Sequence, residues 1–154
     1  HVERIALDGD PASYKFPRPM LHSDDLNLSF SGLKTSVLYK VKEIDQMHDS
    51  IKSNIAASFQ AAVIEVLVKK ITKTIESTGR KEIIIAGGVA ANKKLRSSMK
   101  ELEDTLDIKV FYPDLKYCGD NAAMIAYLGS LRGSSKNKPV ESCVRARWPL
   151  SELS

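Results

Sequence analysis

The sequence Lys81-Glu-Ile-Ile-Ile-Ala-Gly-Gly-Val-Ala-Ala-Asn92 decides the predicted fold of this chain. Its first half is a short apolar run rich in β-branched residues, which is typical of a buried parallel strand. Gly87 and Gly88 end that strand, and a helix is predicted to begin at about Ala91. The stretch therefore predicts a strand, a glycine turn and a helix in succession.

Outward from this stretch, the same alternation covers most of the chain. The other predicted elements are a half-buried strand over 26–30, a helix over 33–44, a core helix over 50–79, a strand over 108–112 and a helix opened by Asp120. Apolar residues recur every fourth position from Ile51 to Ile75; Asp49 or Ser50 can cap this core helix, and Gly79 stops it. Alternating strands and helices predict an α/β layer fold.

The composition fits one ordinary domain, or one lobe of a larger enzyme. The chain has 154 residues, of which 43% are hydrophobic and 27% charged, and no apolar run approaches the roughly 20 residues that a spanning helix needs. Its two cysteines, Cys118 and Cys143, form no CxxC pair, so a reducing cytoplasm is expected. The net charge of +4 is compatible with a polyanionic partner. Because the chain opens at His1 without a signal-peptide pattern, we expect it to begin within a longer protein.

The first candidate site is the turn after the apolar strand, since ligands of open α/β sheets bind where strands end and helices begin. Gly87 and Gly88 let the backbone approach a ligand, and the helix start offers N–H groups to anions. The Asn92 amide can read a purine edge or a ribose hydroxyl. The alternative is a plain turn in which Asn92 only caps the helix.

The second candidate site is Asp120, which follows a glycine at a predicted helix start. The helix dipole keeps such a carboxylate ionised and available to a cation, although a plain N-cap is the alternative. His1, His22 and His48 lack the spacing that places a ligand pair on one helix face, so other metal ligands are expected elsewhere. Cys118 is interpreted as a small packing residue.

Two further turns carry polar groups that could form a site. Asp24 and Asp25 are adjacent, and since neighbouring strand residues point to opposite faces, a solvated turn is predicted rather than an acid and base pair. The Ser31-Gly32 turn has backbone amides that open a helix, and this helix can face the same cleft as the glycine turn.

Four sequence blocks follow one another along the chain: Leu28-Ser-Phe-Ser-Gly-Leu-Lys-Thr35, Ile55-Ala-Ala-Ser-Phe-Gln60, Ala86-Gly-Gly-Val-Ala-Ala-Asn92 and Gly119-Asp-Asn-Ala-Ala-Met-Ile-Ala126. Together and in this order, these blocks resemble the bacterial TsaD family. The resemblance implies the ASKHA fold of actin, Hsp70 chaperones and sugar kinases, a ribonuclease H-like fold in which two lobes clamp a nucleotide. We expect a connecting segment from the missing first lobe over 1–25, the second lobe over 26–133 and a mobile C-terminal tail over 134–154.

The resemblance also implies an activity. The family transfers a threonylcarbamoyl group from threonylcarbamoyl-AMP to N6 of adenosine 37 in tRNAs that read codons beginning with A. It implies that Asn92, Gly87 and Gly88 contact the adenylate. Asp120 would bind one divalent metal ion per subunit, iron or zinc, whose other ligands form an HxxxH motif in the first lobe. Because that motif is absent here, we expect the isolated chain to be inactive.

The implied partners are tRNA, TsaB-like and TsaE-like proteins, with a cytoplasmic location and no membrane. Candidates for contacts with tRNA phosphates are Lys34, Lys69, Lys70, Lys93, Lys94 and Arg96, and solvated helix faces are the alternative for each. Three rival functions stay open: another ASKHA enzyme such as a sugar kinase, a metalloprotease as in the older label O-sialoglycoprotein endopeptidase, and a non-catalytic lobe that binds partners. The sequence lacks HExxH, which disfavours the protease.

Overall fold

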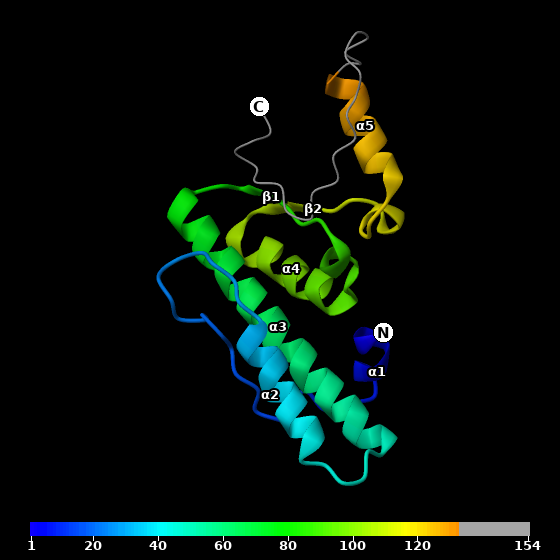
Figure 1. The fold of residues 1–154 in the computed structure, drawn as a ribbon. Helices are drawn as coiled ribbons and strands as arrows, with labels where there is room; N and C mark the ends of the chain where they lie inside the picture. The colour runs from blue at the N-terminus through cyan, green and yellow to red at the C-terminus, as the bar shows by residue number, and fades with distance from the viewer. Residues whose placement is uncertain (133–154) are drawn as a thin grey trace. The chain divides into compact units, whose positions relative to one another are not determined.

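The computed structural model describes residues 1–132, and Figure 1 shows a helix-rich α/β chain. Its elements are α1 (Val2–Ala6), α2 (Ser31–Lys42), α3 (Asp49–Thr78), β1 (Glu82–Ile84), the short 3₁₀ turn η1 (Gly88–Ala91), α4 (Lys93–Leu106), β2 (Lys109–Phe111), the 3₁₀ turn η2 (Leu115–Tyr117) and α5 (Ala122–Arg132). The chain forms two compact units, one over His1–Asp120 and a second that begins at Asn121 and contains α5. The predicted C-terminal tail over 134–154 lies outside the described residues.

Helix α3 organises the first unit. It is 30 residues long and ends at Gly79, whose left-handed backbone (φ 65°) lets its N–H donate to the Ile75 carbonyl at 2.8 Å. This end confirms the predicted glycine stop. The predicted cap was wrong, because the helix already includes Asp49 and no side chain caps its first turn. Asp49 instead pairs with Lys52 at 2.9 Å.

Two apolar clusters lie on different sides of α3. The first is centred on Phe16, Leu33, Ile55 and Ala62, where α3 packs against α2 and the segment before it. The second is centred on Ile64, Leu95 and Met99, where α3 packs against α4. Leu95 and Met99 are 2% and 0% exposed, and Leu102 packs beside them, so these three residues form the inward face of α4. Helix α3 therefore contributes apolar side chains to both clusters.

Strands β1 and β2 form a parallel pair joined by α4. Their register pairs Glu82 with Lys109, Ile83 with Val110 and Ile84 with Phe111. The parallel arrangement was predicted, but the full burial was not confirmed, because only the central Ile83 and Val110 are half-buried and Ile84 is 78% exposed. Helix α4 packs against β2.

The strand predicted over 26–30 does not form. Leu26 and Leu28 are 47% and 48% exposed, and the segment has no regular structure. A strand needs a neighbour for its backbone hydrogen bonds, and β1 and β2 make the only sheet within residues 1–132. Helix α2 begins at Ser31, so Gly32 lies inside the helix rather than in a turn, and the prediction of a Ser-Gly turn was wrong.

By length and composition alone, α3 is the one helix in the described part of the chain that is long and apolar enough to cross a membrane. A core helix of a soluble protein passes the same test, so the indication is weak. Here α3 packs against α1, α2 and α4. The predicted lack of a membrane partner therefore stays a prediction.

Candidate functional site

The glycine loop, residues 87–92, connects β1 to α4. Gly87 has φ 84° and ψ 178°, a backbone combination essentially confined to glycine, and Gly88 begins η1 with an ordinary φ. Both glycines are exposed, and a Cβ added to either would meet nothing within 4 Å. The loop therefore leaves open space beside its backbone, while its bend requires glycine at position 87 alone.

Asn92 caps α4 and is half-buried. Its Oδ1 accepts from the Leu95 N–H at 2.9 Å, and its Nδ2 donates to Gln60 Oε1 of α3, also at 2.9 Å. Asn92 is thus the N-cap of α4, as the alternative interpretation of this residue predicted. An amide has two donor hydrogens and two acceptor lone pairs, so one donor and one acceptor of Asn92 are left for a ligand.

The first turn of α4 has a second partner within the chain. Glu3 Oε1, from α1, accepts from the Lys93 N–H at 2.5 Å. Together with the Asn92 cap, this contact satisfies two of the amides that the sequence predicted to face an anion. The glycine loop, rather than the bare helix start, is therefore the part of this junction that is open to a ligand.

The aspartate loop, residues 113–120, follows β2. Asp120 is exposed at the end of the first unit. In the second unit, α5 begins at Ala122, and Asn121 Oδ1 accepts from the Met124 N–H at 2.9 Å. Asn121 therefore makes the capping bond that the plain reading assigned to Asp120. Cys118 is 3% exposed, in agreement with its interpretation as a packing residue.

Arg96 joins the glycine loop to the aspartate loop. Its Nε donates to the Ala90 carbonyl at 2.7 Å, its guanidinium lies 4.4 Å from the centre of the Tyr112 ring, and its Nη2 lies 3.8 Å from Cys118 Sγ. Burial raises the pKa of the Tyr112 hydroxyl, and the Arg96 charge opposes that rise. Sequence reasoning proposed Arg96 for tRNA phosphates and missed this role, which depends on tertiary neighbours.

Lys70 is not available to a phosphate, so its predicted contact with tRNA was wrong. The side chain is buried in α3, and its ammonium donates to the Ser23 carbonyl at 3.2 Å, to Ser23 Oγ at 2.7 Å and to the Asp25 carbonyl at 2.6 Å. The Asp25 carboxylate accepts from the Asn27 N–H at 2.9 Å, which lowers its pKa. The predicted turn at Asp24 and Asp25 is confirmed, and the hydrogen bonds from Lys70 hold this turn against α3.

A metal site is not complete in this part of the chain. Among residues 1–132, no three His, Cys, Asp or Glu side chains come together as a ligand group. Asp120 offers a single exposed carboxylate. A divalent ion held by one carboxylate keeps most of its water and binds weakly. The described residues do not fit a metal ion by themselves.

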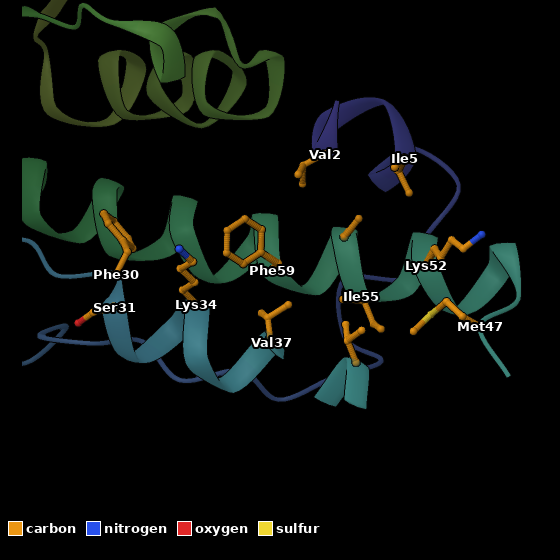
Figure 2. A pocket seen from close by; sticks show the side chains of 12 residues that line it. Val2, Ile5, Phe30, Ser31, Lys34, Val37, Met47, Lys52, Ile55 and Phe59 are labelled. Carbon is orange, nitrogen blue, oxygen red and sulfur yellow. The ribbon is translucent and has the colours of Figure 1, made fainter. Parts of the chain in front are cut away.

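An apolar groove lies elsewhere, between α1, α2 and α3, with Val2, Val37 and Phe59 among its walls (Figure 2). Its volume is about 710 Å³. Ser31 and Lys34 of the first family block also line it, but no residue of the glycine loop does. A smaller cavity of about 380 Å³ is lined by Gln60, Glu3 and Lys93, next to the first turn of α4. This smaller cavity therefore borders Gln60, which accepts the hydrogen bond from the Asn92 side chain.

A parallel strand, a glycine loop and an asparagine-capped helix define an α/β chain with an open glycine loop at the end of its first strand. The sequence model of the TsaD family, described as tRNA N6-adenosine threonylcarbamoyltransferase, matches residues 1–127, and the chain belongs to this family.

Curated relatives carry the same name, tRNA N6-adenosine threonylcarbamoyltransferase. The protein of Herminiimonas arsenicoxydans is 45% identical over 157 residues, covering 99% of this chain and 46% of the relative. That of Methylobacillus flagellatus is 44% identical over 154 residues, covering 99% and 45%. That of Neisseria meningitidis is 38% identical over 170 residues, covering 99% and 48%. The chain thus spans about half the length of the relatives it matches.

Proposed function

We propose that this chain provides the adenylate-binding half of a tRNA N6-adenosine threonylcarbamoyltransferase of the ASKHA fold. The single observation that carries the proposal is the glycine loop, exposed and open beside its backbone, in a chain that matches the family over residues 1–127. The complete enzyme would move the threonylcarbamoyl group from threonylcarbamoyl-AMP to N6 of adenosine 37 in tRNA. The small parallel sheet and its helices are consistent with one ASKHA lobe.

In this proposal, Gly87, Gly88 and Asn92 bind the adenylate. The exposed backbone of the two glycines lets a ligand come close without meeting a side chain. The remaining donor and acceptor of Asn92 can pair with a purine edge or with a ribose hydroxyl. Holding the adenylate in one orientation contributes to catalysis, because a fixed geometry removes the entropy cost of bringing the reactants together.

Asp120 is proposed as one ligand of a divalent ion, iron or zinc. Its exposed carboxylate is suited to such a role, and the other ligands would have to come from the part of the relatives that this chain does not cover. Since no ligand group forms within residues 1–132, binding of the ion is expected only when the two parts are together.

The tRNA surface is proposed to involve Lys34, Lys69, Lys93 and Lys94, which are all exposed. Phosphate contacts by such lysines are electrostatic and weaken with salt. Lys70 is excluded by its burial, and Arg96 is occupied by its contacts with the two loops. TsaB-like and TsaE-like partners and a cytoplasmic location are proposed from family membership.

Reconstitution tests this function. The chain is mixed with the part of the Herminiimonas arsenicoxydans relative that it does not cover, and incorporation of a labelled threonylcarbamoyl group from threonylcarbamoyl-AMP into tRNA is measured. We expect modification by the mixture and none by either part alone. If the two parts associate but the mixture does not modify tRNA, the result would favour a non-catalytic lobe that binds partners. Phosphorylation of a small metabolite, or cleavage of a glycoprotein, would favour the rival enzymes.

A further inference from the structure

We propose that Gln60 is a positioning residue for the adenylate site, because it fixes the orientation of the Asn92 amide. This inference rests on the proposed function of Asn92. Gln60 lies on α3, 32 residues before Asn92, and it is the one side chain outside α4 and its cap that hydrogen bonds to Asn92 within residues 1–132.

The direction of every hydrogen bond in this network follows from chemistry. The Leu95 backbone N–H can only donate, so it must face the oxygen of the Asn92 amide, at 2.9 Å. The Asn92 nitrogen then points the other way, toward Gln60. Because that nitrogen can only donate, Gln60 must present its own oxygen, at 2.9 Å. The amides of Asn92 and Gln60 are thus both locked against a flip.

Gln60 is held in place because the residues around it on α3 are packed in the core. Ala57 and Ser58, on the preceding turn, are 4% and 0% exposed, and Ala62, two residues on, is 0% exposed. Gln60 and Asn92 are both half-buried, so their mutual bond is partly shielded from water. Without Gln60, the Leu95 amide would be the only group left to restrain the Asn92 side chain.

The two hydrogen bonds of the Asn92 amide determine which of its polar groups a ligand can contact. One N–H and one lone pair of this amide are used internally, and the other N–H and lone pair keep a fixed direction. A ligand that pairs with both gains from a site that is already oriented, because no side-chain entropy is lost on binding. Gln60 would therefore raise adenylate affinity without touching the adenylate.

The test is a double-mutant cycle on AMP binding in the protein reconstituted with the remaining part of the relative, measured by calorimetry. Gln60→Met keeps the length of the side chain but cannot accept strongly. We expect it to weaken AMP binding about tenfold, the effect of losing one useful hydrogen bond. Asn92→Ala should weaken binding at least as much, and the double variant should bind no worse than Asn92→Ala alone. Additive losses, or an unchanged Kd in Gln60→Met, would overturn the role of Gln60.

A conservative variant and a spectroscopic readout separate this role from a loss of stability. Gln60→Glu retains the acceptor, and it should bind adenosine, which carries no charge to be repelled, within about twofold of the original protein. In NMR spectra of the chain alone, Gln60→Met should shift the Asn92 side-chain amide and speed its hydrogen exchange. If the Asn92 side-chain amide signals do not change in Gln60→Met, Gln60 does not fix the orientation of this amide. If Asn92→Ala itself leaves AMP affinity intact, the proposed adenylate site fails, and the role of Gln60 fails with it.

Discussion

Lys70 and Asp25 are joined twice across the first unit: the Lys70 ammonium donates to the Asp25 carbonyl at 2.6 Å and lies 3.7 Å from the Asp25 carboxylate. The lysine is 4% exposed, and its remaining bonds go to Ser23. A buried ammonium is stable only when its donors are satisfied. The loop before α2 is therefore held on α3 by Lys70, together with Lys73, whose ammonium donates to the Ser23 carbonyl at 3.0 Å.

Replacing this lysine should loosen the loop. Lys70→Met removes three hydrogen bonds and leaves the Asp25 carbonyl without its donor, while the Ser23 carbonyl keeps the bond from Lys73, so we expect a loss of about 2–4 kcal/mol in the free energy of unfolding. Lys69→Met is the matched control, because Lys69 is exposed on the same helix. Chemical denaturation measures both. Equal stability of the two variants would show that the ammonium does not hold the loop.

The glycine loop should tolerate a side chain at one of its glycines and not at the other. Gly87→Ala places a Cβ on a backbone with φ 84°, at a cost of about 1–3 kcal/mol, although no atom blocks the space. Gly88 has an ordinary φ and the same open surroundings, so Gly88→Ala should change stability by less than about 0.5 kcal/mol. Thermal unfolding compares the two variants. A larger effect at Gly88 would contradict the backbone assignment.

Removing the Arg96 contacts should expose the Cys118 thiol. Arg96→Met loses the bond to the Ala90 carbonyl, the stacking on Tyr112 just before the aspartate loop, and the 3.8 Å contact of Nη2 with Cys118 Sγ within that loop. In a Cys143→Ser background, we expect labelling of Cys118 by a thiol reagent to become about tenfold faster, because a buried thiol reacts through local opening. Lys94→Met, at an exposed position of the same helix, serves as the control. Unchanged labelling in Arg96→Met would mean that Arg96 does not close this loop.

Acid should weaken the contact between α4 and β2. Glu103 Oε1 accepts from the Val110 N–H at 2.7 Å, and this bond lowers the pKa of the Glu103 carboxyl below its ordinary value of 4.5. A depressed folded-state pKa contributes stability that is present above about 4.5 and is lost as pH falls through the lower value. Glu103→Gln should therefore unfold with a shallower pH dependence below pH 4.5 than the original chain. Acid unfolding of both proteins is followed by circular dichroism. Equal slopes of stability against pH for the variant and the original chain would contradict the prediction.

Local patterns predicted the helices, because α-helical hydrogen bonds join residues four apart. The fourfold spacing from Ile51 to Ile75 and Gly79 gave the extent of α3 almost to the residue. The segment 26–30 shows the opposite case, since a strand depends on a partner that its own sequence does not contain.

The site was predicted less completely than the helices, for the same reason. Gly87, Gly88 and Asn92 lie together on one loop as expected, because they are close in sequence. The roles of Gln60, Arg96 and Lys70 depend on neighbours 32, 22 and 45 residues away. Gln60 closes one of the quoted family blocks and is a polar residue on a core helix, which is the signal that could have singled it out.

The bond from the Lys93 N–H to Glu3 links positions 90 residues apart, so an acceptor on α1 completes the start of α4. A substitution that removes the Glu3 carboxylate should therefore disturb the chain directly after the glycine loop, even though Glu3 belongs to a distant helix. Because the donor is a backbone amide, the identity of the side chain at position 93 does not decide whether this contact forms.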